Sequence, residues 1–276
     1  DIVHTNNLVG MTPSIWDAAH KKGIPVVHTL HDYHLLCPRT TLLRSDKSNC
    51  ENPPLPCKVL SRLKMRQTHQ VAVVTAPSQF VLNRHLEAGG FLKAATHVVP
   101  NACEYLPPDV PDRPDNGPVH GLFLGQLDDH KGILVLLEAL QILFSDSRWD
   151  KLHFDFAGAG PFETRVRDFC NSHPTRATFH AVVKGQNKFD LLAKSSFLVV
   201  PSVWNDNYPL SILDGFSWGL PVIGSNRGGI PEVIRHDQDG LIIEPESSAL
   251  AGAIERYLSD DNLRLKHGKS ARNRAE

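Results

Sequence analysis

The sequence lacks the features typical of membrane-spanning and of secreted, disulfide-linked proteins. No stretch approaches the roughly 18 consecutive apolar residues that a membrane span needs. The start, Asp1 to His4, has no basic segment followed by an apolar run, so no signal peptide is expected. The 5 cysteines are an odd number, and no Asn-x-Ser/Thr acceptor occurs. These absences favour a reducing compartment and predict a cytoplasmic location.

An excess of charge of either sign is also absent. With 29 Lys and Arg against 30 Asp and Glu, the chain has no large basic field, so a nucleic-acid partner is not expected. Its 276 residues, 41% hydrophobic and 21% charged, suit a globular protein with a buried core, and the length favours two domains. The missing initial Met and an early strand-like segment suggest that the sequence starts inside a domain.

Short β-rich runs alternate with helical stretches, which is typical of parallel sheets joined by crossover helices. Helices are predicted at residues 13–21 and 78–88; Ser78 can cap the second, and glycines follow both. The pattern predicts half of a doubly wound domain. The strands predicted in the first half are 2–5, 26–30, 71–76 and 97–99.

A proline-rich break at residues 106–118 follows, where the chain cannot form a regular helix. We therefore predict a partial N-terminal domain at 1–105, a linker at 106–118 and a C-terminal Rossmann-like domain at 119–276. The strands predicted in this second domain are 119–124, 152–157, 178–182, 197–200, 221–224 and 241–243.

The most informative stretch, Pro201 to Gly215, joins an apolar strand to a helix. Asp206 and Asp214 lie eight positions apart around this junction and can hold the hydroxyls of a sugar nucleotide. The amides at the helix start are predicted to face a phosphate, because they lack partners and lie at the positive end of the helix dipole. Those amides belong to Tyr208, Leu210 and Ser211.

This segment, continued by residues 218–225 and 228–232, resembles the donor-binding core of family-4 retaining glycosyltransferases. That family has the GT-B fold, in which two Rossmann-like doubly wound domains face each other across a cleft. Its pattern is Glu, seven residues, Glu, whereas this chain has Asp at both ends. The resemblance implies that Asp206 contacts sugar hydroxyls and that Asp214 contacts the ribose. Because Asp is one methylene shorter than Glu, direct contacts can become water-mediated.

A second motif, Gly125 to Gly132, follows the first strand of the second domain, where open α/β sheets bind ligands. In the family this position carries Arg and Lys, which grip the donor diphosphate. Lys131 matches the Lys, whereas Gln126 replaces the Arg. A neutral amide weakens the contact by about 1.5–3 kcal/mol unless another cation, such as His130 or Arg227, substitutes.

Two further resemblances concern the rest of the site. His31, in a His-rich turn after a strand, matches the histidine that contacts the reacting sugar, and Asp32 could orient its imidazole. We interpret His28 and His34 as packing or surface residues. Val183 matches the edge at which backbone groups meet the nucleobase.

Metal and nicotinamide cofactors are not expected. The spacing of Cys37, Cys50 and Cys57, in a loop rich in proline and basic residues, fits no tight zinc knuckle, although zinc binding by these thiols stays open. The Gly158-Ala159-Gly160 turn is followed by Pro161 and lacks the third glycine of a dinucleotide fingerprint.

The resemblance implies an enzyme that moves a hexose from a nucleotide-diphosphate sugar to a glycan or lipid-linked acceptor, with retention. A role in cell-surface polysaccharide or glycoconjugate synthesis, at the inner face of the membrane, fits this reading. The family's first strand, Gly-rich loop and full last helix have no counterpart here. Gln126 and the missing Gly-rich loop favour one alternative, a degenerate nucleotide-sugar-binding protein without turnover. A second alternative is another enzyme with the same scaffold, a GT-B sugar-nucleotide epimerase.

Overall fold

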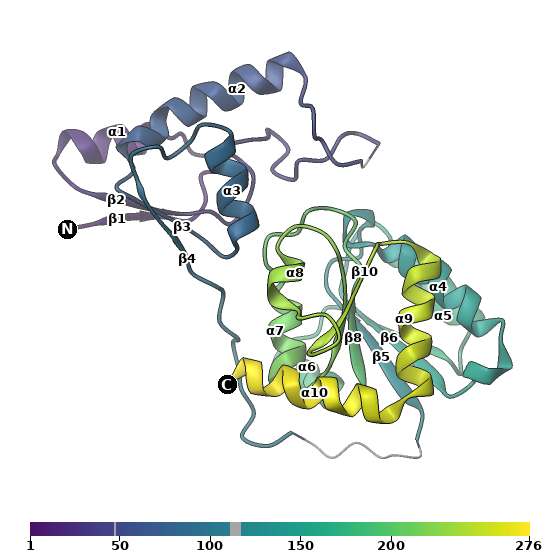
Figure 1. Ribbon diagram of the computed structural model, residues 1–276. Coiled ribbons are helices and arrows are strands. Elements are labelled where there is room, and N and C mark those ends of the chain that lie inside the picture. Colours follow the sequence, from purple (N-terminus) through teal and green to yellow (C-terminus); the bar gives the residue numbers. More distant parts are fainter. Residues whose placement is uncertain (47, 111–116) are drawn as a thin grey trace. The chain divides into compact units, whose positions relative to one another are not determined.

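The computed structural model describes residues 1–46, 48–110 and 117–276 (Figure 1). The chain divides into two compact units, each built on a parallel β-sheet, so the predicted α/β fold with two Rossmann-like domains is confirmed. The first unit contains Asp1–Asn101 together with Trp204–Tyr208, and the second contains Ala102–Val203 and Pro209–Glu276. None of the helices in the described part of the chain is both long and apolar enough to span a membrane.

The first unit has a four-stranded sheet in the order β1-β2-β3-β4, with every pair parallel. A helix follows each of the first three strands, as a parallel crossover requires. The first two predicted strands agree with the observed bounds to within one residue at each end, whereas β3 starts two residues later and β4 two residues earlier than predicted. The elements are β1 Val3–Thr5, α1 Ser14–Lys21, β2 Val26–Thr29, α2 Leu55–Arg66, the 3-10 helix η1 Gln67–Gln70, β3 Val73–Ala76, α3 Gln79–Glu87 and β4 Ala95–Val98.

The predicted loop that carries Cys37, Cys50 and Cys57 is wrong at its end, since Cys57 lies in helix α2. Pro54 is the N-cap and another proline follows in the first turn, where the missing amide hydrogen breaks no helical hydrogen bond. Residues 57–66 are mostly Leu, Lys, Arg and Met, which favour helix. The prolines of the predicted loop therefore start this helix.

The second unit has a six-stranded parallel sheet in the order β10-β9-β8-β5-β6-β7. The strands predicted at 119–124, 152–157 and 197–200 are confirmed residue for residue, whereas β7 ends two residues before the predicted end. The elements are β5 Val119–Leu124, η2 Asp129–Lys131, α4 Ile133–Phe144, η3 Ser147–Trp149, β6 Leu152–Ala157, α5 Glu163–Ser172, β7 Ala177–His180, α6 Gln186–Lys194, β8 Phe197–Val200, α7 Leu210–Ser217, β9 Val222–Ser225, α8 Ile230–Val233, β10 Gly240–Ile243, α9 Ser247–Ser259 and α10 Asp261–Ala275.

Helices cover both faces of this second sheet, which makes three layers (Figure 1). The main apolar core lies between the sheet and α4, α5 and α9, and Phe154, Phe156 and Phe197 are fully buried in it. On the other face α7 packs closely against β8 and β9, because Gly215 leaves no side chain between them. Burial on both faces explains why these strands are nearly continuous apolar runs.

Backbone contacts join the loops at the carboxyl ends of these strands. The Gly125 amide donates to the Ala157 carbonyl over 3.0 Å, and the Val203 amide donates to the His130 carbonyl over 3.1 Å. Gly158 has φ +149° and Gly132 has φ +76°. A Cβ at Gly158 would overlap the Gly125 carbonyl oxygen, so only glycine allows this approach.

The two units meet in sequence at Asn101 and Ala102. The predicted linker was 106–118, and its residues 111–116 lie outside the described part of the chain. Of the rest, the Pro107 carbonyl accepts a hydrogen bond from Arg272 over 2.7 Å within the second unit. The assignment of Trp204–Tyr208 to the first unit was not predicted from the sequence.

We expect Gly158→Ala to lower the free energy of unfolding by about 2 kcal/mol or more, because the new methyl needs both a strained φ and a shifted loop. Urea unfolding followed by circular dichroism measures the change. The matched control is Gly252→Ala in α9, where a Cβ meets nothing within 4 Å and alanine should stabilise by about 0.5–1 kcal/mol. Equal effects of the two substitutions would contradict the account.

Candidate functional site

The candidate donor site lies at the carboxyl ends of the strands in the second unit. All six strands are parallel, so the loops after β5, β6, β7, β8 and β9 reach the same edge of the sheet. The loop after β5 carries Gln126 and ends in η2, whose last residue is Lys131. The loop after β8 leads into α7. The two loops touch directly, since Gly132 lies against the Pro201 carbonyl.

Helix α7 begins at Leu210, with Pro209 as its N-cap and no side-chain capping bond. The amides of Leu210 and Ser211 therefore lie in the first turn, where no helical acceptor exists for them. These amides and the helix dipole favour an anion. Tyr208 precedes the N-cap, so the prediction that its amide also opens the helix is wrong. Pro209, which lies between Tyr208 and Leu210, has no amide hydrogen to donate.

The neutral Gln126 is exposed, and the cations proposed as substitutes have partners of their own. His130 lies 3.2 Å from Asp128, nitrogen to carboxylate oxygen. Arg227 pairs with Glu244 at 2.8 Å and also donates to the Asn226 carbonyl. His130 is thus held within its own loop, and Arg227 is held against the loop after β10.

Asp214 forms an ion pair that the sequence did not reveal. The Lys188 ammonium in α6 donates to Asp214 Oδ1 over 2.8 Å and lies 3.6 Å from a carboxylate oxygen of Glu104. The Asp214 side chain is only 16% exposed. Burial raises the pKa of the Asp214 carboxyl, and Lys188 opposes that shift. Lys188 thereby keeps the carboxylate of Asp214, whose side chain is shorter than the Glu of the family pattern, in a fixed position on α7.

Aromatic rings lie beside this ion pair. Tyr105 stacks on Phe189 with centroids 4.6 Å apart, and Phe189 lies 5.8 Å from Trp218. Phe189 follows Lys188 directly in α6, so the same helix supplies the cation and the ring. Val183 is half-buried in the loop between β7 and α6. Its backbone lies at the same sheet edge as the other loops.

Asp206 belongs to the first unit by its contacts and is 5% exposed. The Trp204 indole donates to Asp206 Oδ2 over 3.2 Å. The segment around it is held by side chains of that unit: Tyr33 donates to the Asn205 carbonyl over 2.9 Å, and Ser78 donates to the Asn207 carbonyl over 2.9 Å. Asp206 is therefore a fixed carboxylate, not a mobile turn residue.

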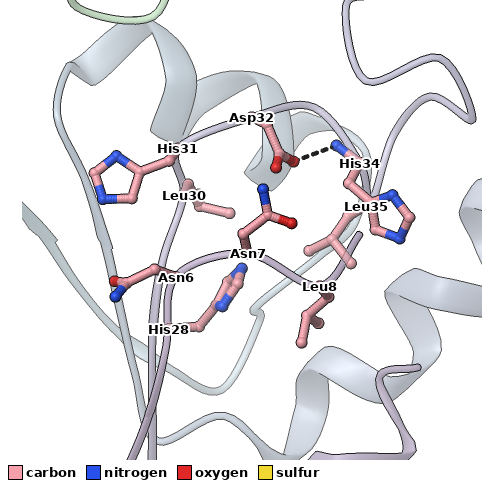
Figure 2. A pocket seen from close by; sticks show the side chains of 9 residues that line it. All are labelled: Asn6, Asn7, Leu8, His28, Leu30, His31, Asp32, His34 and Leu35. Carbon is pink, nitrogen blue, oxygen red and sulfur yellow. Dashed lines mark hydrogen bonds between the residues drawn. The ribbon is translucent and has the colours of Figure 1, made fainter. Parts of the chain in front are cut away.

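His31 and Asp32 point in different directions from the loop after β2 (Figure 2). Asp32 Oδ1 accepts the His34 amide over 2.6 Å, which closes a turn, so the prediction that Asp32 orients the His31 imidazole is wrong. The His31 side chain is exposed, and its carbonyl accepts a hydrogen bond from Asn207 over 2.5 Å. The turn thus fixes the backbone under His31 and leaves the ring at the surface of the first unit.

The small pocket drawn in Figure 2 lies at the carboxyl ends of β1 and β2. His28 at its floor is buried, packs against Trp16 at 5.0 Å between ring centroids, and bonds to the Thr5 hydroxyl over 2.8 Å. Burial, aided by the nearby His85, lowers the pKa of His28 to about 3. His28 is therefore a neutral packing residue, as the sequence predicted. His34 is half-buried, and its carbonyl accepts a hydrogen bond from Lys64.

Comparison with known families agrees with this geometry. The profile described as Glycosyl transferases group 1 matches residues 119–260, and the profile described as Glycosyltransferase Family 4 matches residues 1–104. The chain belongs to the group 1, family-4 glycosyltransferases. The resemblance recognised in the sequence is thus confirmed over both units.

Among curated proteins, the chain is 28% identical over 146 residues to an uncharacterized glycosyltransferase of Methanocaldococcus jannaschii, covering 52% of this chain and 36% of that one. It is 24% identical over 238 residues to an uncharacterized protein in the cps region of Klebsiella pneumoniae, covering 85% and 60%. It is also 25% identical over 300 residues to a D-inositol 3-phosphate glycosyltransferase of Xylanimonas cellulosilytica, covering 99% and 67%. The chain spans less than two thirds of the first two relatives.

Solved structures that share the fold include two that are similar to the whole length of the chain. HepE of Anabaena in complex with UDP has a TM-score of 0.77 and 19% identity, covering 100% of this chain and 73% of its own. A glycosyltransferase of Rickettsia africae has a TM-score of 0.73 and 21% identity, covering 100% and 71%. At these identities the likeness establishes the glycosyltransferase fold.

The Lys188–Asp214 pair predicts a pH dependence. In Lys188→Met, burial and the charge of Glu104 act on Asp214 without an opposing cation, so its folded-state pKa rises further above the unfolded value. A raised carboxyl pKa means that stability present at acid pH is lost as pH rises through that pKa. We expect the variant to match the wild type at low pH and to be about 1–3 kcal/mol less stable near neutrality.

Urea unfolding across that pH range measures the difference. Lys184→Met, an exposed lysine in the neighbouring loop, is the matched control and should show no such pH trend. Adding Asp214→Asn to Lys188→Met should abolish the trend, because no carboxyl remains to titrate. A trend that persists in this double variant would contradict the assignment of the pH dependence to Asp214.

Proposed function

We propose that the protein is a retaining glycosyltransferase that moves a hexose from a nucleotide-diphosphate sugar to a glycan or lipid-linked acceptor in polysaccharide or glycoconjugate synthesis. The observation that supports it best is the set of groups at one sheet edge of the second unit. A lysine in the loop after β5 lies near the two helix-start amides and the half-buried carboxylate of α7, because glycine-dependent contacts hold the loops before these elements together. The protein's family supports the same reading.

The second unit would hold the donor. Lys131 and the amides of Leu210 and Ser211 supply positive charge to the diphosphate, and Gln126 contributes a neutral donor there. Asp214 accepts hydrogen bonds from the ribose hydroxyls. The backbone at Val183 meets the nucleobase. Charge that develops on the departing diphosphate is then stabilised by preorganised donors, which needs no obligatory metal.

The first unit supplies the remaining roles. Asp206 accepts hydrogen bonds from hydroxyls of the transferred sugar, and its burial keeps it in place for this. His31 contacts the reacting sugar with its exposed imidazole. Each role follows from the matched family position and from the fixed backbone beneath it.

A UDP-hexose is the first donor to test. HepE of Anabaena, which shares the fold, was crystallised with UDP and with UDP-glucose. The sucrose-phosphate synthase of Thermosynechococcus elongatus has the same fold, with a TM-score of 0.73 at 20% identity, covering 99% of this chain and 68% of its own. A thermal-shift screen of UDP-, GDP- and ADP-sugars selects the donor, because a bound ligand raises the melting temperature. Binding without product would identify a degenerate binder, and product without acceptor would identify an epimerase.

Lys131→Ala should reduce kcat for sugar transfer by about 100-fold or more, because it removes a charge that stabilises the leaving diphosphate. The melting temperature should change little, since Lys131 ends a short 3-10 helix outside the core. The measurement is the rate of nucleotide release with the selected donor and acceptor. Lys151→Ala, an exposed lysine directly before β6, is the control. Parallel loss of fold and turnover in Lys131→Ala would count against the assignment.

Gln126→Arg tests the departure from the family pattern. An arginine there should tighten nucleotide-sugar binding by about 1.5–3 kcal/mol, or roughly 10-fold to 150-fold in Kd, through a charge-assisted bond to the diphosphate. Calorimetric titration measures it. Gln141→Arg on the exposed surface of α4 adds the same charge elsewhere and should leave Kd unchanged. Unchanged affinity in Gln126→Arg would show that the diphosphate does not bind at this loop.

A further inference from the structure

Imidazoles gather around one buried carboxylate on the face of the second sheet opposite its main apolar core. His120 on β5 pairs in register with His153 on β6, and their ring centroids lie 5.0 Å apart. Asp155 lies two residues beyond His153 on β6, so its side chain points to the same face. The Asp155 side chain is completely buried. No role in the proposed sugar transfer uses these residues.

The ligand atoms have a spacing close to that of a metal site. One atom each from His120, His153 and Asp155 lies within 4.8 Å of the others. His120 Nδ1 and Asp155 Oδ2 are 3.1 Å apart. In a tetrahedral zinc site with bonds of about 2.0–2.2 Å, neighbouring ligand atoms are about 3.3 Å apart. One edge of the site is therefore already formed, and the third ligand needs a side-chain movement of less than about 2 Å.

Surrounding hydrogen bonds orient the ligands. His153 Nδ1 lies 3.2 Å from the Thr175 carbonyl, so it carries the proton, and Nε2, now 2.9 Å from the Thr178 hydroxyl, has the lone pair. A backbone carbonyl is a usual partner for the second nitrogen of a metal-bound imidazole. His180 Nε2 lies 2.7 Å from Asp155 Oδ1 and fixes the carboxylate plane.

Lys194 supplies the positive charge that this carboxylate needs in the present structure. Its ammonium lies 3.0 Å from Asp155 Oδ1, on the oxygen that does not face His120. A buried carboxylate without a cation would be costly. The Lys194 side chain is 43% exposed, so it can turn toward solvent when another cation binds. Lys194 thus competes with an ion without occupying its position.

We propose that His120, His153 and Asp155 bind a divalent transition-metal ion of the Zn²⁺ type, with solvent as the fourth ligand. Nitrogen and oxygen ligands of this kind suit zinc. Two of the ligands are the second residues of β5 and β6, so the site lies away from the carboxyl ends that carry the donor groups. An ion there ties β5 to β6 and stabilises the second unit.

The test is a titration of the whole chain with Co²⁺, after treatment with a chelator. We expect one ion per chain, with the visible absorption of four-coordinate Co²⁺ and without a thiolate charge-transfer band, and Zn²⁺ should displace it. The band should survive the triple substitution Cys37→Ser, Cys50→Ser, Cys57→Ser. Absence of any such spectrum, or its loss in the cysteine variant, overturns the proposal.

His153→Gln should weaken Co²⁺ binding by at least about 10-fold and abolish the rise in melting temperature that Zn²⁺ gives the wild type. His236→Gln, an exposed histidine of the same unit outside the cluster, should bind as the wild type does. If His153→Gln fails to fold, His120→Asn replaces it. Unweakened binding in the folded variant contradicts the site.

Lys194→Met distinguishes a metal site from a purely structural ion-pair network. Removal of a competing positive charge should tighten Co²⁺ binding by about fivefold, while the ion-free protein loses thermal stability. An ion-pair network alone predicts the lower stability and no gain in affinity. A Co²⁺ affinity that stays equal or falls in Lys194→Met would overturn the proposal.

Discussion

Close approach of peptide backbones at the carboxyl ends of the second sheet is the constraint on which the candidate site depends. Parallel strands bring several loops to one edge, but they do not fix the loops against each other. That is done where glycine lets one loop lie on the next, as Gly158 does against Gly125 and Gly132 does against Pro201. A side chain at Gly132 would separate the loop that carries Lys131 from the loop that leads to α7, and one at Gly158 would separate the loops after β5 and β6. The donor groups are thus positioned by backbone packing before any ligand binds.

Ion pairs and hydrogen bonds then fix the two candidate carboxylates, Asp214 and Asp206, on this backbone. Asp214 is buried enough that its charge would be costly, and Lys188 offsets that cost from the neighbouring helix. Asp214 reaches less far than a Glu would, but its contact with Lys188 gives it a defined position. Asp206 reaches a similar result differently, because the first unit holds its segment by bonds to main-chain carbonyls. Both carboxylates are therefore preorganised, although their partners have nothing in common.

The sequence predicted strands correctly where an apolar run has clear ends. The strands at 119–124, 152–157 and 197–200 were predicted at their observed bounds, because apolar runs buried on both faces end at glycine, proline or polar residues. Helix α2 was missed, because prolines that usually end a helix here lie at its start. Helix α7 begins two residues after Tyr208, and Asp32 binds the amide of His34 and not the ring of His31. Both predictions were wrong because helix caps and turns are not visible in the periodicity of the sequence.

Partners distant in sequence could not be predicted. Lys188 and Asp214 are joined only because α6 and α7 pack on the same face of the sheet. His120 and Asp155 meet because β5 and β6 are neighbours in a definite register. Alternation did give a usable signal, since His153 and Asp155 are two residues apart in an apolar strand and must share a face. That signal places polar groups together without naming what they bind.

The position of β5 and β6 connects the two proposed sites. The Gly125 amide and the Ala157 carbonyl join the two strands at their carboxyl ends, next to the loop that leads to Lys131. His120 and His153 lie side by side near the opposite ends. An ion bound there would restrain the same pair of strands from the other end, without contact with the donor loops. It would therefore act on sugar transfer through the stability of the second unit, so its removal should affect thermal stability before it affects the chemistry at Lys131.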